Sequence, residues 1–153
     1  MAAHHTVPVL LCGRREDIAS VVMAELRPKY EVVQCIMSPD DGLINLPLTL
    51  SGSKPRNPES NLGSRDFSRT PRAVVLGGGY DDATVEMLRK TVTETKGARK
   101  VPWLKADQGK TAAGPPPGSE GYPVSVATRV KESLDSLEKE GKLEGNEDGI
   151  FTW

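Results

Sequence analysis

The sequence predicts an α/β protein: a small three-layer, parallel-sheet fold of the Rossmann-like or flavodoxin-like kind, with about four strands in the order 2-1-3-4. Residues 73–82 carry this prediction most clearly, because four apolar residues run into three glycines and then two aspartates, the pattern of a buried strand, a loop and a helix start. Residues 7–17 repeat the pattern around Gly13. Nearly all-apolar strands that alternate with helices are typical of parallel sheets covered on both faces.

The first half of the chain alternates between strand and helix patterns. Its predicted elements are a strand, a helix, a strand and a less regular helix, over residues 7–12, 16–26, 30–37 and 43–50. The first helix has aliphatic residues at helical spacing until Pro28 ends it. The last segment also fits a strand, since Pro47 interrupts its helical pattern. We favour the helix because parallel strands need a crossover between them.

The second half continues the alternation. Its predicted elements are a strand, a helix, a strand and a final helix, over residues 73–76, 82–95, 100–104 and 124–140. Val85, Leu88 and Val92 share one face of the first of these helices. The final helix has one aliphatic stripe and one charged stripe, and Gly141 ends it.

Two stretches have no apolar period. Residues 51–72 carry five basic residues against two acidic ones, and a loop of this length in a compact domain is a lid, a binding loop or a disordered segment, three interpretations that stay open. Residues 108–123 are rich in glycine and proline and predict a semi-rigid tether into the final helix. We expect residues 1–153 to form a single domain, since this length suits one hydrophobic core.

The composition disfavours several classes of partner. Twenty basic and twenty-one acidic residues leave a net charge of −1, which argues against nucleic acid or an anionic membrane as the main partner. Apolar runs stay well below the roughly 18 residues that span a bilayer, and the first residues lack a signal-peptide pattern. Cys12 and Cys35 fall in strands and are expected to be reduced core thiols. We therefore expect a cytoplasmic protein that binds neither nucleic acid nor a membrane.

The candidate ligand site lies where the predicted strands end. Ligands of open parallel sheets bind beyond the carboxyl ends of the strands, where the strand order reverses, which is here between the first and third strands. Two glycine loops meet at that point, and backbone amides at the following helix starts can hold a phosphate or a carboxylate. The predicted ligand-binding residues are Gly13, Arg14, Arg15, Gly77, Gly78, Gly79, Tyr80 and Asp81.

These residues also have purely structural interpretations. The three glycines can serve only to allow a tight turn with positive φ. Asp81 fits a helix cap better than a catalyst, and Arg14 and Arg15 can be solvated surface charges. The dinucleotide fingerprint is incomplete, because one glycine follows the first strand and no acidic residue ends the second. NAD(P) therefore stays one candidate, and the cofactor is unknown.

Catalytic and metal-binding signatures are missing from the sequence. His4 and His5 are the only histidines and stand near the N-terminus, so a Ser-His-Asp or Cys-His catalyst has no well-placed base. Metal-ligand spacings of Cys or His and the Walker pattern are absent as well. The sequence thus predicts no metal site and leaves any catalytic residue unknown.

Four stretches together resemble a known group of proteins. They are Val9-Leu10-Leu11-Cys12-Gly13, residues 73–82, Val101-Pro102-Trp103-Leu104-Lys105-Ala106-Asp107 and Asp148-Gly149-Ile150-Phe151. This combination resembles short, mostly uncharacterised fungal proteins described as Rossmann-like or NAD(P)-binding-like. The resemblance covers most of the chain outside the two irregular stretches. It implies a Rossmann-like fold and no established reaction.

Two functions are compatible with these observations. The first is a Rossmann-like module that binds a small anionic or nucleotide-type ligand, or a protein partner, without a catalytic centre. The alternative is a small accessory enzyme of metabolism that uses a nucleotide cofactor, with Tyr80, Asp81, Asp107 or Cys12 as acid or base. We also expect a homodimer, because the final helix and the aromatic tail at 150–153 offer apolar surface; docking of the tail on its own domain is the alternative.

Overall fold

The computed structural model describes residues 6–145 and 147–153, and its centre is a parallel β-sheet. The strands of the described part are β1 (Val7–Cys12), β2 (Tyr30–Ile36), β3 (Val74–Leu76), β4 (Trp103–Lys105) and β5 (Ile150–Thr152). They lie in the order β2-β1-β3-β4-β5, and every neighbouring pair is parallel. The α/β class and the order of the first four strands are confirmed, and a fifth strand extends the sheet. His4 and His5 lie outside the described residues.

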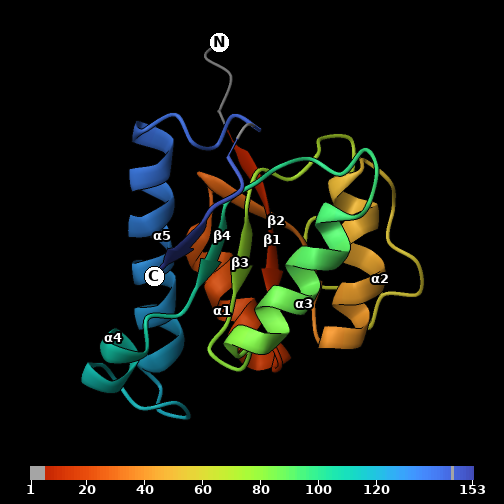
Figure 1. The fold of residues 1–153 in the computed structure, drawn as a ribbon. Coiled ribbons are helices and arrows are strands. Elements are labelled where there is room, and N and C mark those ends of the chain that lie inside the picture. Colours follow the sequence, from red (N-terminus) through yellow and green to blue (C-terminus); the bar gives the residue numbers. More distant parts are fainter. Residues whose placement is uncertain (1–5, 146) are drawn as a thin grey trace.

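Helices cover both faces of this sheet (Figure 1). They are α1 (Glu16–Leu26), α2 (Pro39–Leu50), α3 (Asp82–Thr93), α4 (Gln108–Ala113) and α5 (Tyr122–Lys139). Helices α1 and α5 pack on one face and α2 and α3 on the other, so two apolar layers form. We call them the α1/α5 layer and the α2/α3 layer. This three-layer arrangement fits a Rossmann-like or flavodoxin-like fold.

Strand β1 shows why the central strands are apolar at every position. Val9 and Leu11 pack in the α1/α5 layer, whereas Leu10 and Cys12 pack in the α2/α3 layer. Successive side chains of a strand point to opposite faces, so a strand between two helical layers has no solvent-facing side. The ambiguous segment after β2 is a helix, α2, which contains Pro47.

The long polar loop covers the β2 edge of the sheet. The Cys35 N–H donates to the Leu62 carbonyl at 3.0 Å, and the Ser64 N–H donates to the Val32 carbonyl at 2.8 Å. Gly63 lies between these bonds with φ of +120°, and a Cβ atom there would sit 2.5 Å from the Val33 carbonyl oxygen. Free backbone N–H and C=O groups on an edge strand can pair with another chain, and this loop forms hydrogen bonds with those groups of β2 instead.

The C-terminal tail packs on its own domain, contrary to the expectation that it contributes to a homodimer interface. Ile150–Thr152 pairs with β4 as β5, and the Trp153 side chain beyond it is 1% exposed. The aliphatic stripe of α5 is likewise buried, mainly against α1. Most of the apolar surface that was expected to bind a second copy is therefore used within the chain, although Ile150 stays 39% exposed. The oligomeric state itself stays a prediction.

The remaining differences concern short elements. Helix α4 occupies part of the stretch expected to be an irregular tether, and α5 begins at Tyr122, two residues before the predicted start. Strand β4 comprises Trp103–Lys105, later than the predicted 100–104. Elements of three to six residues give too few positions for a period to be recognised.

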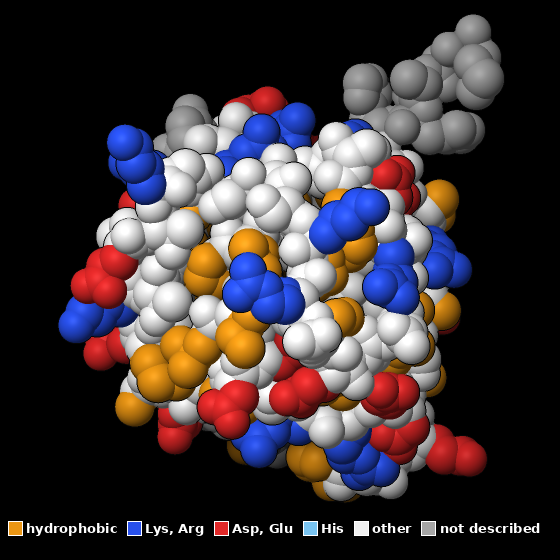
Figure 2. All heavy atoms as spheres, turned by 90° about the vertical axis from the view of Figure 1, so that its right-hand side faces the viewer, with side chains coloured by type: hydrophobic (Ala, Val, Ile, Leu, Met, Phe, Trp, Pro, Cys, Tyr) orange, Lys and Arg blue, Asp and Glu red, His pale blue; other side chains and the backbone are white. Residues whose placement is uncertain are grey.

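The outer face over α2 and α3 is mixed in polarity. Figure 2 shows acidic and basic side chains scattered over this face, with hydrophobic side chains gathered at one side of it. Ile44 of α2 and Met87 of α3 are 49% and 42% exposed. Among the described residues, no helix combines the length and the apolar character needed to cross a membrane.

Candidate functional site

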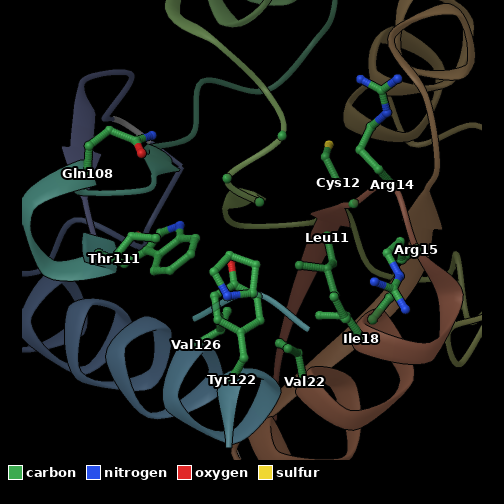
Figure 3. A pocket seen from close by; sticks show the side chains of 17 residues that line it. Leu11, Cys12, Arg14, Arg15, Ile18, Val22, Gln108, Thr111, Tyr122 and Val126 are labelled. Atoms are coloured by element: carbon green, nitrogen blue, oxygen red, sulfur yellow. The ribbon is translucent and has the colours of Figure 1, made fainter. Parts of the chain in front are cut away.

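A cavity of about 400 Å³ lies at the carboxyl ends of β1 and β3. Its walls come from the loops that follow these strands, from α1 and α5, and from α4 (Figure 3). Strand order reverses at this point, since β1 leads to β2 on one side and pairs with β3 on the other. The cavity therefore occupies the position at which open α/β sheets bind ligands.

Backbone hydrogen bonds hold each of the two glycine loops against the end of a neighbouring strand. The Gly13 N–H donates to the Ile36 carbonyl and the Gly77 N–H donates to the Cys12 carbonyl, both at 2.8 Å. A Cβ atom on Gly77 would lie 3.3 Å from that Cys12 oxygen, closer than side chains ordinarily approach. Gly77 thus permits the close contact between the ends of β1 and β3.

The structural interpretation of the three glycines as a tight turn with positive φ is wrong. None of Gly77, Gly78 and Gly79 has φ in the left-handed region that favours glycine. What they supply is space: a Cβ on Gly78 would lie 3.7 Å from the Tyr122 hydroxyl oxygen, and one on Gly79 would lie 2.9 Å from Cγ of Arg14. The loop therefore forms a wall of the cavity without side chains.

Tyr80 and Asp81, the last two predicted residues, lie outside the lining of the cavity. Tyr80 packs in the α2/α3 layer, where its hydroxyl donates to the Gly13 carbonyl at 3.0 Å, and burial raises the pKa of its hydroxyl. Asp81 caps α3 by accepting from the Thr84 N–H at 2.8 Å, and hydrogen bonding by the side chain and then the backbone of Thr84 lowers the pKa of its carboxyl. Tyr80 links the two glycine loops, and Asp81 fixes the helix that follows.

The two arginines stand at the mouth of the cavity. Arg15 forms an exposed ion pair with Asp17, with Nη2 and Oδ2 2.6 Å apart, and this hydrogen bond lowers the pKa of the Asp17 carboxyl. Arg14 runs across Gly79 and points away from Tyr122 in Figure 3. Helix α1 begins directly after Arg15 with no side-chain cap, and Glu16 and Asp17 occupy its first turn. The mouth is thus close to neutral.

The wall formed by α4, α5 and the tail was not predicted from the sequence. Tyr122 and Val126 of α5 and Thr111 of α4 reach the cavity (Figure 3), and Trp153 lines it too. The Trp153 indole N–H donates to the Leu76 carbonyl at 2.9 Å, and the Arg129 guanidinium lies 4.5 Å from the indole ring. The sequence does show an aromatic tail and a Gly-Tyr-Pro stretch at the start of α5. Neither pattern indicates that the ring of Trp153 or of Tyr122 faces this cavity.

The acid–base candidates are engaged in structural roles. Cys12 is fully buried, and burial raises the pKa of its thiol, as burial raises that of Cys35 to about 12. Both thiols are therefore neutral at physiological pH. Asp107 caps α4 by accepting from the N–H groups of Gly109 and Lys110. Within the described ranges, His, Cys, Asp and Glu side chains do not cluster in threes as a metal site would require.

The fold and the site together describe an α/β protein with a parallel sheet and a largely apolar cavity at the point where its strand order reverses. No family model and no solved structure matches the chain. It is 33% identical over 141 residues to "Kojic acid related protein 6" of Aspergillus oryzae, an alignment that covers 92% of this chain and 84% of that relative. The chain belongs to the same family as this fungal protein.

Proposed function

We propose that the protein is a small-molecule-binding module whose ligand occupies the cavity between the β1 and β3 loops. The cavity itself supports the proposal, since its volume of about 400 Å³ falls in the range of ligand pockets. Its walls come from segments that are distant in sequence and converge at the end of the sheet. Six of the eight residues predicted to bind ligand line it: Gly13, Arg14, Arg15, Gly77, Gly78 and Gly79.

The proposal requires no catalytic residue. The nearby acid and base candidates are a buried neutral thiol, Cys12, and two helix caps, Asp81 and Asp107. We therefore favour a binding or regulatory role over the alternative of an accessory enzyme. Cytoplasmic localisation, a single domain and assembly as a homodimer belong to this proposal as predictions.

A thermal-shift panel tests the proposal. It contains NAD, NADP, mononucleotides, sugar phosphates, inorganic phosphate and small uncharged aromatic compounds. Kojic acid is included because the name of the A. oryzae relative associates that protein with it. A ligand at 100 times its dissociation constant adds about 2.7 kcal/mol to the free energy of unfolding. A panel in which no compound stabilises the protein would count against the proposal.

Substitution of Gly78 locates the site. Gly78→Val adds a branched side chain toward Tyr122 and should lower the affinity for any ligand of the panel at least about tenfold, while the fold persists because Gly78 has no positive φ. Gly78→Ala is the matched control, because its Cβ lies at an ordinary contact distance of 3.7 Å. Equal affinity of the folded Gly78→Val variant and the wild type would place the site elsewhere.

A further inference from the structure

We infer that the ligand is a small, planar, uncharged molecule whose hydroxyl or carbonyl oxygen is held by the hydroxyl of Tyr122. This inference rests on the proposed function, because it names the class of ligand for the same cavity. It departs from the anionic or nucleotide-type ligand that the sequence favours. Three features of the cavity carry it: a largely apolar lining, the Tyr122 hydroxyl that opens onto it without a protein partner, and a mouth where two arginines stand beside two carboxylates, Glu16 and Asp17.

The lining of the cavity is largely aliphatic and aromatic. Leu11 of β1, Val22 of α1 and Val126 of α5 point into it (Figure 3). Trp153 adds an indole ring whose N–H already donates to the Leu76 carbonyl, so the ring offers apolar contact rather than a hydrogen bond. Apolar rings beside aliphatic side chains favour a flat hydrocarbon body over a ribose or a phosphate chain.

Tyr122 supplies the polar contact. The residue is 8% exposed and extends from α5 toward the glycine loop, where a Cβ atom on Gly78 would lie 3.7 Å from the hydroxyl oxygen. Among the described residues this hydroxyl has no hydrogen-bond partner. Because Tyr122 lines the cavity, its hydroxyl is free to donate a hydrogen bond to a molecule bound there. A ligand oxygen in the cavity would complete the hydrogen bonding of Tyr122.

The charges at the mouth disfavour a phosphorylated ligand. Arg15 is neutralised by Asp17, and Arg14 is directed away from Tyr122. Glu16 adds a negative charge in the first turn of α1, where a phosphate would otherwise approach the helix amides. Since a nucleotide phosphate carries about two negative charges and needs unpaired cations or amides, an uncharged ligand fits this cavity better.

Titration with matched aromatic probes tests the inference. We would measure the affinities of benzyl alcohol, toluene, phenyl phosphate and AMP by calorimetry for the wild type and for Tyr122→Phe. Tyr30→Phe is the control, because it removes a hydroxyl that binds Asp135 away from the cavity. Wild type should bind benzyl alcohol at least about fivefold more tightly than toluene, and both phosphates at least about tenfold more weakly than benzyl alcohol.

The variant separates the role of the hydroxyl from that of the ring. Tyr122→Phe should remove the preference for benzyl alcohol over toluene and leave the toluene affinity within about twofold, whereas Tyr30→Phe should change neither. Tighter binding of phenyl phosphate or AMP than of benzyl alcohol would overturn the inference and leave the proposed function standing. So would an unchanged preference in Tyr122→Phe. If none of the four probes binds, the inference is rejected, and the wider thermal-shift panel then decides the proposed function separately.

Discussion

Gly63→Ala should be the most disruptive single-methyl change in the chain. The added Cβ would lie 2.5 Å from the Val33 carbonyl oxygen and 2.8 Å from the Gln34 backbone nitrogen, so the loop would have to move away from β2. A φ of +120° is also a conformation that alanine rarely adopts. The change therefore combines a steric clash with backbone strain.

The expected cost follows from these two effects. Backbone strain in a region open mainly to glycine costs about 1–3 kcal/mol. Relieving the clash costs about another 1–3 kcal/mol, because the loop must shift and weaken its hydrogen bonds to β2. Gly63→Ala should thus lower the free energy of unfolding by about 4 kcal/mol, a large share of the 5–15 kcal/mol typical of a domain.

Gly97→Ala is the matched control, measured beside Gly63→Ala by urea denaturation. Gly97 also has positive φ, at +89°, but a Cβ there would meet nothing within 4 Å. In both variants the replacement of glycine by alanine lowers the conformational entropy of the unfolded chain by the same amount. The difference between their free energies of unfolding therefore reports the steric contact with β2. Gly63→Ala should be less stable than Gly97→Ala by about 2 kcal/mol. Equal stabilities would refute the account of the loop as a tightly fitted cover of the β2 edge.

Two further predictions concern the α1/α5 layer. Trp153→Ala should lower the free energy of unfolding by about 3–5 kcal/mol, because the ring is buried and donates to the Leu76 carbonyl; a loss below about 1 kcal/mol in urea would contradict the docking of the tail. Burial opposes ionisation of Asp135, but hydrogen bonds from Tyr30 and Lys29 outweigh it and lower the pKa of its carboxyl from 3.8. The ionised carboxylate therefore stabilises the fold above about pH 4, and because solvent screens this half-exposed pair, the free energy of unfolding of the wild type should exceed that of Asp135→Asn by only about 0.5–1 kcal/mol at pH 7. This difference should vanish as the pH falls below 3.8. A difference that does not change with pH would be inconsistent with this explanation.

The central strands could be predicted because their sequence pattern is unambiguous. Residues 7–12 and 73–76 are nearly all apolar and are followed by glycine, a pattern that strongly favours a strand buried on both faces. The reversal of strand order between β1 and β3, and with it the place of the cavity, followed from the ordinary rules of βαβ connection.

The other half of the cavity could not be predicted, because its residues depend on long-range packing. Trp153 reaches the cavity only because Ile150–Thr152 pairs with β4, and three residues have no recognisable strand period. Tyr122 was placed in a semi-rigid tether, since the prolines before it hide the start of α5. The glycine loop was located correctly, but its backbone conformation depends on contacts with Cys12 and Arg14 that the sequence does not reveal.

Mapping of amide chemical shifts tests the central claim, that the cavity at the β1 and β3 ends is a binding site. ¹⁵N-labelled protein would be titrated to saturation with the tightest compound of the thermal-shift panel. The largest shifts should fall on the Gly77, Gly78 and Gly79 amides, the Tyr122 amide and the Trp153 indole N–H, all in the cavity wall. Saturable shifts confined to other surfaces, such as the outer faces of α2 and α3, with these signals unmoved, would contradict the claim.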